Sequence, residues 1–281
     1  MTIAISMKVN DGIVLASDSA ATIMGRFPNG AEGVINIYEN ANKIFNLYKG
    51  YPVGAITWGS GSIGQSSIST LAKDFRNLIK DDSEYKIDIH NYAIEDIAKK
   101  FKKFIYDEHY LKEFKEWKVK PALGFMIVGY SSGQPLAEEW KIDVINGDCP
   151  VPYRIRQQNE IGITWNGEIE AINRVYLGFG TKLPFILQQA GLDNTKIEEI
   201  KTLCRKNLTV PMVMPPMPIQ DAIDLAIYLV EITIRFARFA PGAPTVGGPI
   251  EVAAITKHEG FKWVLRKHYY DENLNQIIRR D

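Results

Sequence analysis

The first two residues of the chain, Met1-Thr2, could supply a catalytic nucleophile. Methionine in front of a residue as small as threonine is a good substrate for methionine aminopeptidase, so we expect Met1 to be removed. Removal would leave a free α-amine and a hydroxyl on Thr2. A hydroxyl is a weak nucleophile that needs a nearby base. An α-amine, whose ordinary pKa is about 7.7–8.0, accepts a proton at neutral pH. Thr2 would thus carry both the nucleophile and the base of a hydrolytic reaction.

Two charged residues could support this chemistry. Asp18 ends an apolar run, and an acid at the end of a buried strand is costly unless it is paired. Lys43 stands directly before an apolar stretch. A buried Asp18–Lys43 pair beside Thr2 would lower the proton affinity of the amine and orient both groups. The same residues could instead form a structural salt bridge or two exposed charges, and their spacing does not decide between these interpretations.

The elements around these residues must position them. Residues 2–9 and 12–18 are β-rich and are joined by Asn10-Asp11-Gly12, which is typical of a hairpin. Residues 43–47 and 53–58 predict a second strand pair. Taken alone, Thr2 could be an ordinary second residue at a frayed chain end. The hairpin favours the catalytic interpretation, because a strand that starts beside Thr2 would hold it in place.

The segment from Thr2 to Thr22, TIAISMKVNDGIVLASDSAAT, resembles the opening of proteasome β subunits, which start with Thr and continue as K-x-x-D-G-V-V-L-A-x-D-S-x-x-T. The resemblance implies an N-terminal-nucleophile hydrolase with an α+β fold. That fold is a four-layer αββα sandwich, in which two antiparallel sheets lie between helix layers. On this resemblance Thr2 matches the nucleophile, Asp18 the acid beside it, and Lys43 the lysine that tunes the threonine.

The resemblance also implies where a substrate would bind. Ala21 and Thr22 match the stretch that holds the substrate backbone beside the nucleophile. Residues 53–59, VGAITWG, resemble the strand end whose backbone amide stabilises the oxyanion, a role that any side chain permits. The candidate amides are those of Ala55, Ile56 and Thr57.

Two later segments resemble the family less closely. Residues 174–180 resemble the strand that leads to a G-S-G turn, with Phe179 in place of a serine near the threonine amine. Residues 244–252 resemble D-x-x-S-G-G-x-I-D-V, with Ala243 and Val246 in place of the aspartate and serine that support the nucleophile. The second segment is closer to bacterial ancestral β-type proteins, the Anbu group, than to archaeal or eukaryotic subunits. The site would keep Thr, Asp and Lys but lack these further polar groups.

The remaining sequence predicts alternating groups of strands and helices. Helices are expected at 64–80, 91–107, 183–191, 195–206 and 219–239. Further strands are expected at 122–130, 135–145, 151–165, 174–178, 250–255 and 263–267. Residues 23–42 are polar and glycine-rich, which indicates a loop or an irregular insertion. Helices grouped between sets of strands argue for α+β layers and against a parallel sheet. We expect one domain over residues 1–281.

Composition excludes several classes of protein. Of the 281 residues, 33 are Lys or Arg and 33 are Asp or Glu, so net charge gives no attraction to nucleic acid or anionic membranes. The most apolar long segment, residues 222–239, carries four charged residues and makes a poor membrane span. Two cysteines and no visible signal peptide fit a reducing compartment. We expect a cytoplasmic protein without a membrane or nucleic-acid partner.

Other motifs do not indicate a cofactor. The four histidines are scattered and lack the spacing of metal ligands. Gly59-x-Gly61-x-x-Gly64 matches part of a dinucleotide fingerprint, but no strand follows the next helix to complete a βαβ unit. We therefore expect neither a metal nor an organic cofactor.

These observations favour a threonine-type hydrolase that cleaves peptide or amide bonds. Because proteasome-like proteins work in rings or related assemblies, the resemblance implies a homo-oligomer; it names no unfoldase partner. One alternative is a catalytically weak or inactive ring or scaffold protein, which the substitutions at Ala243 and Val246 motivate. A second alternative is a non-proteolytic amidase that uses the same threonine chemistry.

Overall fold

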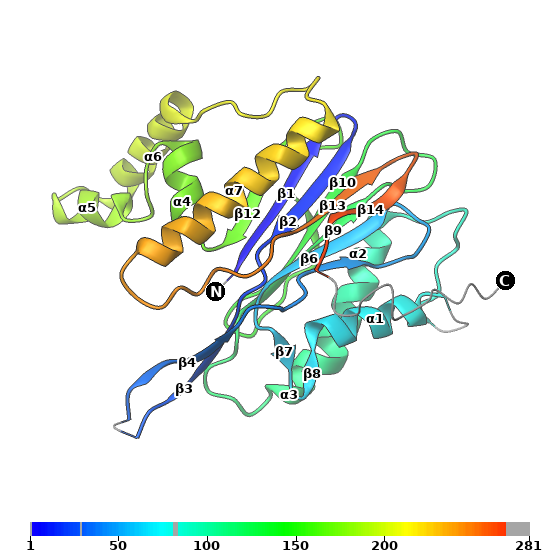
Figure 1. The fold of residues 1–281 in the computed structure, drawn as a ribbon, viewed down its shortest axis with the longest axis horizontal. Helices are drawn as coiled ribbons and strands as arrows, with labels where there is room; N and C mark the ends of the chain where they lie inside the picture. The colour runs from blue at the N-terminus through cyan, green and yellow to red at the C-terminus, as the bar shows by residue number, and fades with distance from the viewer. Residues whose placement is uncertain (1, 29, 81–83, 268–281) are drawn as a thin grey trace.

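Two five-stranded antiparallel sheets form the centre of the protein (Figure 1). The computed structural model describes residues 2–28, 30–80 and 84–267. The first sheet has the order β12 (Gly162–Gly167), β1 (Ile3–Val9), β2 (Gly12–Ser17), β13 (Glu251–Thr256) and β14 (Gly260–Leu265). The second sheet has the order β11 (Tyr153–Arg154), β10 (Glu138–Val144), β9 (Leu123–Gly129), β6 (Val53–Gly59) and β5 (Ile44–Asn46). This confirms the predicted β1–β2 hairpin and the predicted pairing of residues 43–47 with 53–58.

Both faces of β1 are buried, and its alternating side chains pack against a different layer on each face. Ile3, Ile5 and Met7 pack in a cluster with helix α7 (Ile219–Phe239). Ala4 belongs to a separate buried cluster that contains residues of both sheets. Successive side chains of a strand point to opposite faces, so β1 is enclosed by a helix on one side and by the second sheet on the other.

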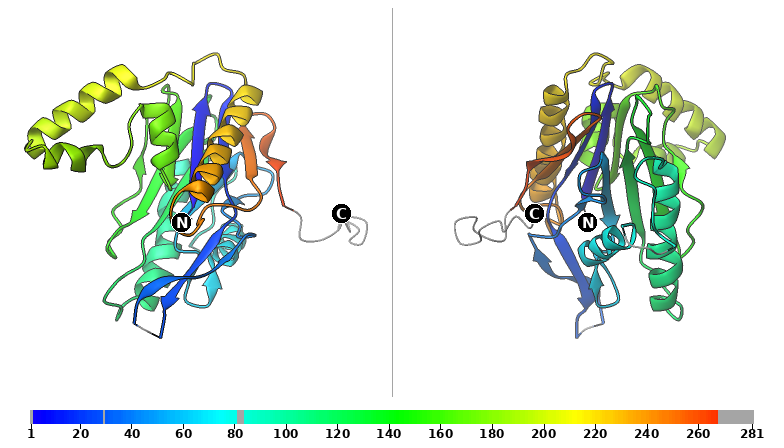
Figure 2. Two further views of the ribbon diagram at one scale, coloured as in Figure 1. Left: turned by 60° about the vertical axis from the view of Figure 1, so that its left-hand side comes forward. Right: turned by 90° about the vertical axis from the view of Figure 1, so that its right-hand side faces the viewer.

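Helices lie on both sides of this pair of sheets. α7 lies on one side, and α1 (Ile68–Leu78) and α2 (Ile94–Lys102) lie on the other (Figure 2). Ser67 caps α1 by accepting the amide of Thr70. The second predicted helix extends beyond 107, because α2 continues into a π-helical stretch, Lys103–Tyr110, and then into α3 (Leu111–Glu113). Within the described ranges no helix is long and apolar enough to cross a membrane.

The segment expected to be a loop forms a hairpin instead. β3 (Ala21–Arg26) and β4 (Glu32–Tyr38) pair with each other and extend away from the two sheets (Figure 1). Gly25 and Gly33 lie opposite each other in this hairpin. A Cβ at Gly25 would lie 2.0 Å from Ile35 Cδ1, and one at Gly33 would lie 2.7 Å from the Phe27 ring. The glycines that suggested a loop therefore make room for neighbouring apolar side chains within a strand pair.

The strand predicted at 174–178 is also wrong, because this segment is helical. α4 (Glu170–Ile172) continues as a π-helical turn, Asn173–Leu177, which ends at Gly178 with a φ of +79°. The place beside β1 is already taken by β12. The side chain of Asn173 accepts a hydrogen bond from Trp165 Nε1 of β12, at 2.9 Å, and ties the helix to that strand.

Most of the other elements follow the sequence-based expectation, but the strand expected at 151–165 is two separate strands, β11 and β12, and the helix expected at 64–80 begins only at Ile68. The helices predicted at 183–191 and 195–206 are α5 (Leu183–Gln189) and α6 (Asn194–Leu208). The predicted strands 122–130, 135–145, 250–255 and 263–267 correspond to β9, β10, β13 and β14, although β14 begins earlier, at Gly260. A short pair, β7 (Ser62–Ile63) and β8 (Ser66–Ser67), precedes α1.

Candidate active site

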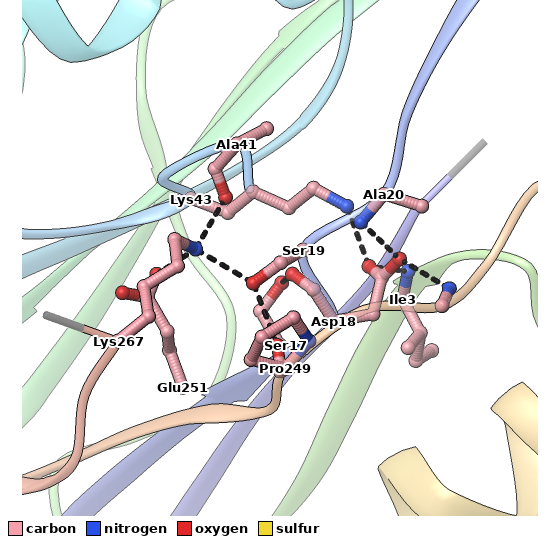
Figure 3. A network of polar contacts seen from close by, with 11 residues as sticks. Ile3, Ser17, Asp18, Ser19, Ala20, Ala41, Lys43, Pro249, Glu251 and Lys267 are labelled. Carbon is pink, nitrogen blue, oxygen red and sulfur yellow. Dashed lines mark hydrogen bonds and ion pairs between the residues drawn. The ribbon is translucent and has the colours of Figure 1, made fainter. Parts of the chain in front are cut away.

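The carboxylate of Asp18 is the centre of a buried polar network at the end of β2 (Figure 3). Its Oδ1 accepts the amide of Ile3 at 3.0 Å and the ammonium of Lys43 at 2.6 Å. Its Oδ2 accepts the amides of Ala20 and Gly247, both at 3.1 Å. Four donors therefore offset the cost of burying this charge. The predicted ion pair between Asp18 and Lys43 is present and is buried.

Thr2 is held on both sides through its main chain. The amide of the next residue, Ile3, donates to Asp18, and the carbonyl of Thr2 accepts the amide of Glu168 at 2.7 Å. Gly167 makes this close approach possible, because a Cβ there would lie 1.8 Å from the Thr2 carbonyl oxygen. Thr2 itself is 6% exposed. Met1 lies outside the described residues.

Lys43 connects the two sheets. Its side chain reaches Asp18 at the end of the first sheet, and its carbonyl accepts the amide of Thr57, at 2.9 Å, in the second. Burial lowers the pKa of Lys43, and the nearby charge of Lys267 lowers it further, whereas Asp18 and Glu251 raise it. Lys43 thus places a buried cation whose proton affinity is reduced next to the residue that follows Thr2.

The three amides predicted for the oxyanion site all lie within the second sheet. Thr57 donates its amide to Lys43. Residues along a strand between two antiparallel neighbours bond alternately to either side, so Ala55 also faces β5, where it is paired with Phe45, and Ile56 faces β9. In the conformation described, the three amides therefore point to neighbouring strands of the sheet and take part in strand pairing.

Ala21 and Thr22 begin β3, at the base of the projecting hairpin. Both are half-buried, and they lie opposite Tyr38 and Ile37 of β4. The preceding residue, Ala20, donates its amide to Asp18. The predicted substrate-binding stretch is therefore continuous with the Asp18 network.

A second buried ion pair, which the sequence did not reveal, lies next to the first. Lys267 Nζ donates to Ser19 Oγ at 2.6 Å and to the carbonyl of Ala41 at 2.7 Å, and it lies 3.1 Å from Glu251 Oε2 (Figure 3). The side chains of Lys267 and Glu251 are 5% and 2% exposed. Burial lowers the pKa of Lys267, and Glu251 raises it. Glu251 falls in the segment that resembles the family, but Lys267, after the last strand, carries no local signal.

The segment 244–252 lies beside Asp18. Gly247 donates its amide to Asp18, and its carbonyl accepts the amide of Ser19 at 2.9 Å. Ser19 Oγ donates to the carbonyl of Pro249 at 2.6 Å. Val246 is buried in the apolar cluster beneath α7, so this position supplies no polar group to the network.

Phe179 was expected at the end of a strand near the Thr2 amine, but the structure does not place it on such a strand. Phe179 follows the helical segment that ends at Gly178 and is not on the strand that lies next to β1. Gly167 pairs with Ile3, and the next residue, Glu168, bonds to Thr2. The turn beside Thr2 is therefore formed by Gly167 and Glu168. The resemblance of residues 174–180 to the family's strand was misleading because residues 174–177 are helical.

Solved structures share this fold, although no family model and no curated protein matches the chain. One is the helical assembly of the Anbu complex from Pseudomonas aeruginosa, with 15% identity over 97% of this chain and 90% of that one and a TM-score of 0.52. Another is an Anbu (Gly-1) mutant from Hyphomicrobium sp. strain MC1, with 14% identity over 98% and 92% of the two chains and a TM-score of 0.54. Over nearly its whole length, the chain has the fold of these Anbu proteins.

Proposed function

We propose that the protein is a threonine-type hydrolase of peptide or amide bonds, with Thr2 as its nucleophile once Met1 has been removed. The observation that carries the proposal is the shared oxygen of Asp18, which accepts both the Ile3 amide and the Lys43 ammonium. This contact fixes the main chain directly after Thr2 and places a buried cation beside it. A positive charge of this kind favours the neutral form of an adjacent amine.

The proposed reaction has two steps. Thr2 Oγ attacks the substrate carbonyl carbon while its proton passes to the free amine of Thr2. The amine then protonates the leaving nitrogen as the C–N bond breaks, and an acyl ester on Oγ remains. Water attacks this ester, the amine accepts the proton of the water, and the acid product leaves as the proton returns to Oγ.

We assign the oxyanion donor to the amide of Gly59, two residues beyond Thr57. The amide of Ser60 donates to the carbonyl of Ala122, so Ser60 faces β9, as Ile56 does. Because the amides along a strand alternate in direction, those of Thr57 and Gly59 both point to the opposite side of β6. β5 starts at Ile44, so the Gly59 amide points past the start of that strand. Gly59 has a φ of +89°, and a Cβ there would lie 2.4 Å from the carbonyl oxygen of Ala122, so the position requires glycine.

The architecture and assembly that accompany this function are inferred as well. We interpret the two sheets and the flanking helices as one four-layer αββα domain. The P. aeruginosa Anbu protein was solved as a helical assembly. We infer that this chain also associates with copies of itself, in a ring or a related assembly.

Mass spectrometry and covalent labelling test the catalytic proposal. The intact mass should lack Met1, and an epoxyketone or β-lactone probe should modify Thr2. Thr2→Ala should abolish labelling, and Thr2→Ser should retain part of it because serine keeps the hydroxyl and the amine. Thr195→Ala, which replaces an exposed threonine of α6, is a matched control that leaves the nucleophile in place. Retention of Met1 on all of the protein would overturn the proposal, because the base would not exist.

A second candidate function is a scaffold with little or no activity. The buried apolar side chain of Val246, where the family carries a serine, favours it. Complete removal of Met1 with no labelling of Thr2 would support the scaffold. If labelling occurs, turnover of small amides but not of peptides would indicate a non-proteolytic amidase.

A further inference from the structure

A cationic cavity lies where the edges of the two sheets meet helix α1. β5 is one of the two edge strands of the second sheet, and β14 is one of the two edge strands of the first. The cavity has a volume of about 460 Å³, within the range of small-molecule sites. Its lining includes Lys49, and Lys73 and Arg76 on α1. It also includes Trp263 on β14 and Arg266 directly after that strand.

The four cations of this lining differ from six basic side chains of the helices that are paired with acids. Lys99, Lys102, Lys103, Arg174, Lys196 and Lys201 each form an ion pair with a nearby acid. Lys49, Lys73, Arg76 and Arg266 form no ion pair with any residue in the described ranges. Glu251 is the one acid among the described residues of the lining, and Lys267 lies 3.1 Å from it. Among the residues that the structure describes, the lining therefore carries four cations and a single acid, which already contacts Lys267.

The two arginines of the lining lie close enough for their charges to interact. The guanidinium of Arg266 lies over the ring of Trp263, 4.8 Å from its centroid. Arg76 is half-buried on α1. Burial lowers the pKa of Arg76, and the positive charge of Arg266 contributes in the same direction. Like charges held near each other repel, and a bound anion would relieve that repulsion.

We propose that this cavity binds the phosphate or carboxylate group of a small molecule. A guanidinium presents planar, parallel donors that match the two oxygens of either group. Arg76 and Arg266 would provide these contacts, and Lys49 and Lys73 would add charge at the rim. The site is distinct from the Thr2 site, although Glu251 lines the cavity and also contacts Lys267 of the Asp18 network.

Calorimetric titration of the full-length protein tests the proposal. Inorganic pyrophosphate probes the phosphate class and citrate the carboxylate class, each at constant ionic strength set with chloride. We expect saturable one-to-one binding of at least one probe. Arg76→Gln and Arg266→Gln should each weaken it tenfold or more. If Arg76→Gln does not fold, Lys73→Gln replaces it, because Lys73 is exposed.

Two controls separate a built site from general attraction. Arg238 also stacks on an aromatic ring, 5.3 Å from the centroid of Phe239, but lies on α7. Arg238→Gln should leave binding unchanged, and Thr2→Ala should bind the probe like the unmodified sequence, whether or not Thr2 is catalytic. Lack of saturable binding of both probes, equal weakening by Arg238→Gln, or loss of binding in Thr2→Ala would each overturn the proposal.

Discussion

Lys43 and Asp18 form a buried ion pair in which Nζ lies 2.6 Å from Oδ1, and the same oxygen accepts the amide that follows Thr2. The pair joins three segments that are distant in sequence: the start of β1, the end of β2 and the residue before β5. Its stability and its electrostatic effect can be measured separately from turnover.

Removing Lys43 should destabilise the fold. Lys43→Ala leaves the carboxylate of Asp18 buried without its counter-charge, so the free energy of unfolding should fall by about 3–5 kcal/mol. Urea unfolding measures this difference. The double variant Asp18→Asn/Lys43→Met removes both charges and should regain part of the loss. A fall of less than about 1 kcal/mol in Lys43→Ala would contradict the burial of the pair, because exposed pairs contribute no more than that.

Gly167 should be intolerant of a side chain. A Cβ there meets the Thr2 carbonyl oxygen at 1.8 Å, and the φ of Gly167 is +93°. Gly133 is a matched control, since its φ is +74° but nothing lies within 4 Å of a Cβ. Gly133→Ala should lower the free energy of unfolding by about 1–2 kcal/mol, the cost of the left-handed conformation. Gly167→Ala should cost more and should also slow probe labelling of Thr2. Equal costs for the two variants would show that β12 does not approach Thr2 this closely.

Lys267 and Glu251 should shift the pH dependence of Thr2 labelling in opposite directions. Lys267 lowers the pKa of Lys43 and Glu251 raises it, and by Coulomb's law the same charges act on the nearby Thr2 amine. Lys267→Met should therefore raise the pKa of the amine and move the rising limb of the pH–rate profile to higher pH. Glu251→Gln should move it to lower pH.

The direction of these shifts distinguishes an electrostatic role from a structural one. The rate of β-lactone labelling, followed by mass spectrometry from pH 5 to 9, gives the midpoint for each variant. Loss of packing alone would reduce the rate of both variants without moving their midpoints. Midpoints that move in the same direction would also contradict the proposed role of the two charges.

Cys149 should react slowly with thiol reagents. Burial raises the pKa of its thiol to about 11, and only the thiolate is nucleophilic. At pH 8 its thiolate fraction is about two orders of magnitude below that of an unperturbed cysteine, whose pKa is about 8.5. Alkylation of the Cys204→Ser variant by iodoacetamide, which reports on Cys149, should accelerate about tenfold per pH unit between pH 8 and 10. A rate that levels off near pH 9 would contradict the raised pKa.

Local patterns were sufficient to predict much of the fold. The turn at Asn10-Asp11-Gly12 and the apolar alternation around it predict the β1–β2 hairpin, and the spacing of apolar residues predicts α7 with the bounds that the structure has. The patterns failed at residues 23–42 and 174–178. The glycines of the first segment suggested a loop, and the apolar run of the second suggested a strand, but in the structure the first is a hairpin and the second is helical.

The candidate site was only partly predictable for the same reason. By itself the sequence determined the local elements, the place of Thr2 directly before a strand, and two charged residues at strand ends that would require a partner. Only the tertiary structure decided which partners they have. It brings Gly247, Glu168 and Lys267 to this network from segments far along the chain. Hydrogen bonds and ion pairs depend on distances of about 3 Å, and sheet order, which no local pattern encodes, sets those distances.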